Sequence, residues 1–265
     1  MRTIFKRIIQ GAGFVRPEIR LMESNMSSNL WQGRWCGMKP AGDNHRRARN
    51  VISPSGCIVR GKFPSRKNGR MVHHEGLPER DAIYLFEASP NVVRYREQPI
   101  TLEYPDGAEL RRYTPDFELV LITGEIILIE VKAVSSLGHE DVQHKFNCVA
   151  EHMRRSKKPF FILTDEVIRQ EPRLSNLRWV LRQAPLIRPS ADAMTVAIIK
   201  LRDCLPASFA EVTALTTDSS VDPYSLLLAG YLRCSLDQPI SDDTLIELNL
   251  EADNGWFYIA QEQGF

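Results

Sequence analysis

Three charged residues near the middle of the chain have the types and spacing that metal-dependent chemistry requires. Asp116 follows Pro115 at the start of one apolar segment, and Glu130 and Lys132 end the next, with a Thr-Gly turn between the two segments. Apolar, β-branched runs on either side of a glycine turn predict a hairpin, so Asp116 and Glu130 would lie side by side. Two carboxylates, the carbonyl of Val131 and an ammonium just beyond would form a hard-oxygen Mg²⁺ site with a lysine at its edge.

The same residues also permit a plainer interpretation, a turn aspartate and a salt bridge on an edge strand. Strand period places Glu130 and Lys132 on one face under either interpretation. Residues 126–131 are mostly apolar, however, which is typical of a buried strand and not of an edge strand. Charges at the end of a buried strand are costly without a task, and this favours a functional site.

A third acid, Glu79, precedes these residues on a predicted helix. Ile83 and Phe86 follow it at helical spacing, so Glu79 lies on the apolar stripe of that helix. A carboxylate on the buried stripe suggests that it points into a site. The alternative is a first-turn acid that favours the helix dipole, and Asp81 and Glu87 could equally be surface charges.

Further predicted elements would hold these residues in a sheet flanked by helices. The expected strands and helices, besides the Asp116–Lys132 hairpin, cover residues 92–97, 100–104, 110–113, 138–156 and 157–164, followed by a helix from about 166. The helix at 138–156 has a basic outer face that includes Lys145. Hairpins, a helix and a buried strand in this order predict an α/β fold with a mixed sheet between helices.

Five short motifs in a fixed order give the chain a resemblance to a known family. They are Ser-Arg-Lys-x-Gly-Arg (65–70), Leu-x-Glu-Arg-Asp (77–81), Val-x-x-Tyr-x-Glu-Gln-Pro (92–99), Tyr-Thr-Pro-Asp-Phe (113–117) and Glu-Val-Lys (130–132). Over roughly residues 51–169 this pattern resembles the TnsA family, endonuclease subunits of heteromeric cut-and-paste transposases with a PD-(D/E)xK, restriction-endonuclease-like fold. Pro78 departs from the pattern, but a proline is harmless in the first turn of a helix.

The resemblance implies a nuclease that uses two Mg²⁺ ions, for which Mn²⁺ is expected to substitute. Carried over, Glu79, Asp116, Glu130 and the carbonyl of Val131 would hold the metal, and Lys132 would be the catalytic lysine. The substrate would be double-stranded DNA at transposon ends. A TnsB-like DDE transposase would join the 3′ ends while the TnsA-like subunit cuts the 5′ strands, and a TnsC-like AAA+ ATPase would contact the C-terminal part.

The charge distribution supports nucleic-acid contact by the N-terminal third. The net charge is +1, but residues 1–74 hold 15 Lys/Arg against 3 Asp/Glu, and the rest of the chain holds 19 against 30. Such a split suggests a basic part that binds phosphate. The predicted DNA contacts, on a glycine-containing backbone, are Lys62, Arg66, Lys67 and Arg70. Gln98 would hold the site or a DNA phosphate, or is simply a turn residue.

We expect four segments along the chain. Residues 1–50 form a basic arm, which is either a solvated tail or a segment that lies along DNA or a partner, and residues 51–170 form the endonuclease domain. A proline-rich linker with one helix, 171–190, leads to a small α-rich domain, 191–265, whose three helices and two short strands are winged-helix-like. That last segment holds 12 acids against 3 bases. Because phosphate would be repelled, a protein-docking role is expected there.

Cysteine spacing and the length of apolar runs indicate the cellular compartment, and two competing functions stay open. The five cysteines are scattered without metal spacing, which is typical of free thiols in a reducing cytoplasm. No apolar run is long enough to span a membrane, so a bacterial cytoplasmic protein, at the nucleoid when acting, is expected. The alternatives to a transposase subunit are a stand-alone restriction or repair nuclease of the same fold and a non-catalytic assembly adaptor.

Overall fold

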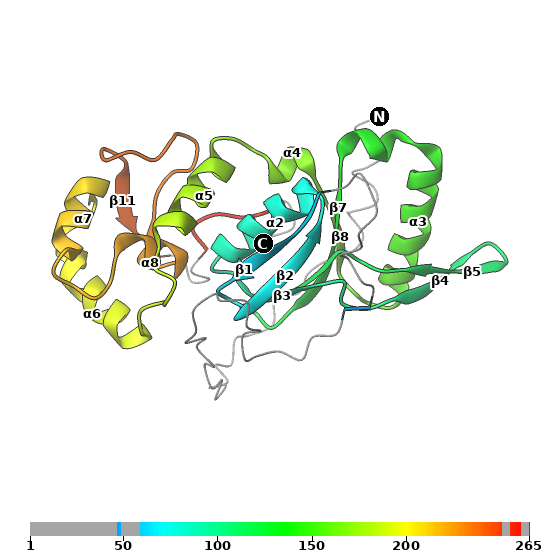
Figure 1. Cartoon of the computed structure of the whole chain (residues 1–265), viewed down its shortest axis with the longest axis horizontal. Helices are drawn as coiled ribbons and strands as arrows, with labels where there is room; N and C mark the ends of the chain where they lie inside the picture. Colours follow the sequence, from blue (N-terminus) through cyan, green and yellow to red (C-terminus); the bar gives the residue numbers. More distant parts are fainter. Residues whose placement is uncertain (1–46, 49–58, 251–254, 261–264) are drawn as a thin grey trace.

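A computed structural model describes residues 47–48, 59–250, 255–260 and 265, and it is organised around a four-stranded sheet. The sheet has the order β3-β6-β7-β8, in which β7 and β8 run parallel and the other neighbours run antiparallel (Figure 1). Its strands are β3 (Val92–Glu97), β6 (Phe117–Leu121), β7 (Ile126–Lys132) and β8 (Phe160–Thr164). The predicted basic arm lies outside the described residues, apart from Arg47 and Ala48.

The central strand β7 separates two hydrophobic clusters because its side chains alternate between the faces of the sheet. Ile127, Ile129 and Val131 belong to the larger cluster, which also contains the apolar side of helix α2 (Leu77–Ala88). Leu128 belongs to the smaller cluster, with side chains of helix α3 (Glu140–Arg155). The mixed sheet is therefore covered by helices on both faces, as predicted from the sequence.

A tight turn sets the pairing of β6 with β7. Gly124 has φ +84°, a conformation that glycine adopts without steric cost, and Phe117 pairs with Ile129. The predicted hairpin is confirmed, with β7 extending through Lys132.

Helix α2 and the hairpin of β1 (Arg60–Ser65) and β2 (Arg70–Glu75) form a layer beside the sheet. Two acids of α2 that could have been surface charges are buried instead, Asp81 and Glu87. Glu87 accepts hydrogen bonds from the backbone N–H groups of Arg66 and Lys67, at 2.7 and 3.0 Å, and from the hydroxyl of Tyr95, at 2.6 Å. This carboxylate therefore ties the β1–β2 turn to the sheet.

The opposite face carries α3, the short 3-10 helix η1 (Val134–Gly138) and a hairpin of β4 (Leu102–Asp106) and β5 (Glu109–Tyr113). The hairpin lies against α3 and extends beyond it, away from the rest of the molecule (Figure 1). It closes on Gly107, at φ +62°, where the sequence predicted a turn. The hairpin is close to the predicted metal site in sequence, because β5 ends at Tyr113, three residues before Asp116.

The C-terminal part follows two helices, α4 (Asp165–Ile168) and α5 (Arg173–Gln183). Its elements are α6 (Ala191–Leu201), η2 (Arg202–Cys204), β9 (Ala207–Ser208), α7 (Phe209–Thr216), α8 (Pro223–Leu228), β10 (Leu232–Arg233) and β11 (Leu245–Leu248). The three helices were predicted, whereas β9 was not, and the short strands form a sheet of order β10-β11-β9. The winged-helix-like character of this part stays a prediction.

Helix α5 lies within the predicted linker, yet it is a core helix. Leu174, Leu177 and Val180 are fully or almost fully buried and belong to the same hydrophobic cluster as the sheet and the C-terminal helices. The buried Asp81 of α2 accepts hydrogen bonds from Arg169, at 2.8 Å, and from Arg178 on α5, at 2.5 Å. Helix α5 therefore joins the two parts through a shared core, whereas residues 185–188 are exposed.

The described part of the chain contains no helix that is both long and apolar enough to cross a bilayer.

We expect Glu87→Ala to lower the free energy of unfolding by about 3 kcal/mol, because two backbone N–H groups and the Tyr95 hydroxyl would lose a buried acceptor. Urea denaturation of the full chain measures this difference. The matched control is Glu103→Ala, an exposed strand residue, for which a change within about 0.5 kcal/mol is expected. Equal effects of the two substitutions would contradict the structural role given to Glu87.

Candidate active site

Asp116 is positioned by the backbone of the neighbouring strand. It directly precedes β6, and continuing the Phe117–Ile129 register by one residue places it opposite Glu130. Its Oδ2 accepts a hydrogen bond of 2.8 Å from the N–H of Val131. Its own carbonyl accepts another of 2.8 Å from the N–H of Gln98. The aspartate is thus fixed from both sides, by β7 and by the segment after β3.

Glu130 and Lys132 lie on the α3 side of β7 and have different exposures. Glu130 is 5% exposed, and its Oε2 accepts a 2.6 Å hydrogen bond from the hydroxyl of Tyr113. The Nζ of Lys132 lies 3.8 Å from Oε1 of the same glutamate. The Lys132 side chain is about one third exposed. The buried carboxylate therefore has a fixed orientation, while the ammonium beside it reaches the surface.

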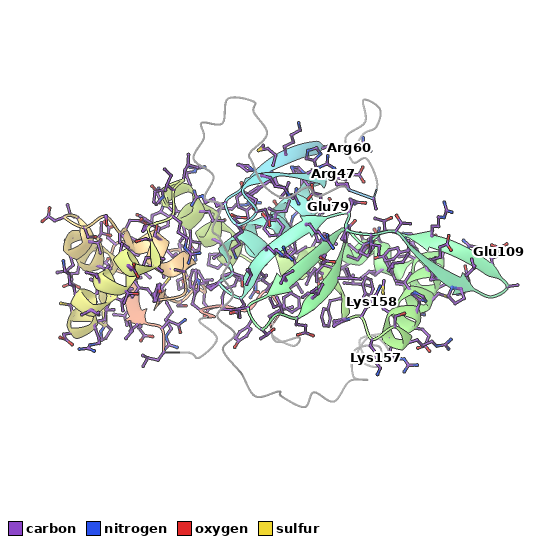
Figure 2. The ribbon with its side chains drawn as sticks, turned by 90° about the horizontal axis from the view of Figure 1, so that it is seen from below. Arg47, Arg60, Glu79, Glu109, Lys157 and Lys158 are labelled. Atoms are coloured by element: carbon purple, nitrogen blue, oxygen red, sulfur yellow. The ribbon has the colours of Figure 1, made fainter. Side chains whose placement is uncertain are left out.

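Glu79 enters from the first turn of α2 (labelled in Figure 2). The helix begins after Gly76, whose φ of 98° is readily adopted only by glycine. The N–H of Glu75, at the end of β2, donates a 2.7 Å hydrogen bond to Oε2 of Glu79. The end of β2 thus holds this carboxylate, which is 9% exposed. Its burial agrees with the predicted place on the apolar stripe.

Asp116 lies close enough to Glu130 and to Glu79 for both charges to act on it. Burial, followed by the charges of Glu130 and Glu79, raises the pKa of Asp116 well above its usual range. The Val131 N–H and the Lys132 ammonium act in the opposite direction but do not reverse the shift. The structure therefore brings all four predicted residues into one electrostatic cluster. Carboxylate oxygens are the donor type that a hard divalent cation such as Mg²⁺ prefers.

Sequence reasoning assigned no role to Tyr113 and placed Lys145 on an outer helix face, yet both lie at the site. The Nζ of Lys145 lies 5.1 Å from the ring centroids of Tyr113 and of Phe146. The Nζ of Lys132 lies 5.9 Å from the same Phe146 ring. Two ammonium groups thus flank one aromatic surface next to Glu130. The place of Tyr113 within the Tyr-Thr-Pro-Asp-Phe motif was the available signal.

Three of the predicted DNA contacts instead have partners inside the protein. The Nζ of Lys67 donates to the carbonyls of Phe86, at 2.8 Å, and of Val92, at 2.6 Å, and also to that of Ser89. The guanidinium of Arg66 donates to the carbonyls of Leu181 and Ala184, at 2.7 and 3.0 Å. These two side chains therefore connect the β1–β2 turn to α2 and α5.

Arg70 forms a buried salt bridge of 2.7 Å with Glu97, so its guanidinium also has a partner inside the protein. Gln98 is 1% exposed and has φ 47°, and its N–H holds the backbone of Asp116. Of the five predicted DNA contacts, Lys62 is the one with an exposed side chain. A charged side chain that is committed to buried carbonyls or carboxylates would lose those bonds on turning to DNA.

The region that contains most of this site matches a known protein family. Residues 89–165 match the family model described as "TnsA-like endonuclease N terminal". The matched stretch contains Asp116, Glu130 and Lys132, whereas Glu79 precedes it. No curated protein sequence matches the chain.

We expect Asp116→Asn to raise the free energy of unfolding in the presence of a chelator at pH 8, by about 1 kcal/mol. The substitution removes the charge that Glu130 and Glu79 repel, while the amide oxygen can still accept the Val131 hydrogen bond. Urea denaturation with EDTA checks this. The control Asp203→Asn alters an exposed aspartate and should change stability little. A loss of stability in Asp116→Asn would show that the carboxylates are not in conflict.

Proposed function

We propose that this chain, which carries a TnsA-like endonuclease domain, is the nuclease subunit of a Tn7-like cut-and-paste transposase and cleaves the 5′ strands at transposon ends. The observation that carries the proposal is the convergence of Glu79, Asp116, Glu130 and Lys132, from α2, the start of β6 and the end of β7. An aspartate whose charge interacts with two glutamates and a lysine suits metal-dependent phosphodiester hydrolysis.

Each residue at the site would have a separate task. Glu79, Asp116, Glu130 and the Val131 carbonyl would hold two Mg²⁺ ions, which supply Lewis-acid stabilisation of a phosphodiester and lower the pKa of a bound water. Lys132, because its ammonium reaches the surface, would orient the water and offset charge on the phosphate. Tyr113 would keep Glu130 in one orientation through its 2.6 Å hydrogen bond.

Partners would supply what this chain lacks in the proposed reaction. The end sequence would be recognised by a TnsB-like transposase that joins the 3′ ends. Residues 191–265, with 12 acids against 3 bases, would dock on a TnsC-like ATPase and not on DNA, because such a surface repels phosphate. The reaction would take place on double-stranded DNA in the bacterial cytoplasm.

Strand-specific cleavage of labelled transposon-end DNA tests the proposal. With Mg²⁺ and the transposase subunit, the chain should nick the 5′ strands, and Lys132→Ala and Asp116→Asn should each slow nicking by about 10²-fold or more. EDTA should abolish nicking, and Mg²⁺ or Mn²⁺ should restore it. The matched control is Lys158→Ala, which removes an exposed lysine before β8 (Figure 2).

Two other outcomes would point to the competing functions. Cutting of arbitrary DNA by the isolated chain would indicate a stand-alone nuclease of restriction or repair. Wild-type assembly with the transposase and DNA, without cleavage under any metal condition, would indicate an adaptor. Undiminished nicking by Asp116→Asn would mean that the active site has been misassigned.

Tyr113→Phe gives a finer test of the site. Loss of the hydroxyl frees Glu130 to reorient, so the Mg²⁺ concentration at half-maximal cleavage should rise by roughly 10- to 100-fold, as for other residues that orient metal ligands. Cleavage rates across a Mg²⁺ titration give this value. The control Tyr224→Phe, in the C-terminal part, should leave the titration unchanged. An unaltered Mg²⁺ requirement in Tyr113→Phe would remove the tyrosine from the site.

A further inference from the structure

A second cluster of possible metal ligands lies on the β4–β5 hairpin and α3, and it shares no residue with the carboxylate site. It consists of Asp106, His144 and Cys148, whose ligand atoms all lie within 4.8 Å of one another. His144 Nε2 is 2.6 Å from Asp106 Oδ1. Cys148 Sγ is 3.8 Å from His144 Nε2 and 3.9 Å from Asp106 Oδ1. One oxygen, one nitrogen and one sulfur therefore lie within reach of a single ion.

The backbone explains why these three side chains meet. His144 and Cys148 are four residues apart on α3, a spacing that puts both on the same face, one turn apart. Asp106 ends β4, at the turn of a hairpin that lies against α3. Arg111, on the paired strand, lies 2.7 Å from Asp106 Oδ2, which leaves Oδ1 directed at the helix. A second residue that orients a ligand in this way is typical of metal centres.

The distances are near those of a tetrahedral zinc site. With Zn–S of about 2.3 Å and Zn–N or Zn–O of about 2.0 Å, ligand atoms lie roughly 3.3–3.6 Å apart. Two of the separations are slightly longer, and the His144–Asp106 separation is shorter. The His144 side chain is 66% exposed. Its ring can therefore move by the ångström or less that tetrahedral coordination requires.

The surroundings leave room for a fourth ligand. An open cavity of about 650 Å³ adjoins Asp106 and His144, and its lining includes the acids Glu109 and Asp141. Water or one of these carboxylates could complete the coordination from this side. Glu109 lies at the outer end of the hairpin (labelled in Figure 2).

We propose that Asp106, His144 and Cys148 bind Zn²⁺ and that the ion fastens the β4–β5 hairpin to α3. The combination of thiolate, imidazole and carboxylate favours zinc over Mg²⁺, which selects oxygen donors. Binding requires the Cys148 thiol to release its proton to solvent. Fastening the hairpin would also fix β5, which ends at Tyr113, the partner of Glu130.

Cobalt substitution provides a direct test that needs no DNA cleavage. Co²⁺ added to the full chain should give a thiolate-to-cobalt absorption band in the near ultraviolet at one equivalent. Using Asp116→Asn as the background reduces cobalt binding at the carboxylate site. In that background Cys148→Ser should abolish the band, and the matched control Cys204→Ser, which alters an exposed cysteine of η2, should retain it.

Zinc affinity, measured by competition with a chromophoric chelator, supplies the second readout. His144→Ala, at an exposed position, should fold normally and weaken zinc binding at least tenfold, and zinc should raise the thermal midpoint of the wild type but not of this variant. A cobalt–thiolate band that persists in Cys148→Ser, no band in the wild type, or unchanged zinc affinity in His144→Ala would each overturn the proposal. These results are independent of whether the carboxylate site cleaves DNA.

Discussion

The pairing of β6 with β7 is the constraint on which the rest of the structure depends. It sets Asp116 opposite Glu130 at the ends of two buried strands and brings the Val131 N–H to the aspartate. Burial, followed by the charges of Glu130 and Glu79, raises the pKa of Asp116, so the fold holds this carboxylate in an unfavourable environment. Burial of Ile127 and Ile129 beneath α2 provides the compensating stability.

The layers around this pair of strands are held together by hydrogen bonds of buried charged side chains. Glu87 accepts hydrogen bonds from the β1–β2 turn, and Lys67 donates to three carbonyls. Asp81 of α2 accepts a hydrogen bond from Arg178 of α5. Each of these contacts connects segments far apart in the chain. Because an unpaired buried charge is costly, the partners of each group limit how the layers can move. The elements that carry the carboxylate site are therefore joined to one another by buried polar contacts.

Local pattern predicted most of the elements and the positions of the acidic residues on them. Alternation, a glycine turn and helical spacing identified the β6–β7 hairpin and the place of Glu79, because those signals depend on near neighbours in sequence. It did not predict the partners of Arg66 and Lys67, which are carbonyls 19 to 118 residues away. Charge alone does not distinguish a lysine that meets solvent from one that meets a helix end. The hydrogen bond from Tyr113 to Glu130 was missed because the two residues are 17 positions apart and meet only through tertiary packing.

Helix α5 links the packing of the C-terminal part to that of the sheet domain. It packs on α2 and on α8, and its apolar face belongs to one cluster that includes the sheet and the C-terminal helices. The last residue, Phe265, also returns to the sheet, where its ring lies 5.5 Å from that of Phe161. Because the two parts share one hydrophobic core, we expect them to unfold together. A displacement of the C-terminal helices would therefore act, through α5, on α2, the helix from which Glu79 projects.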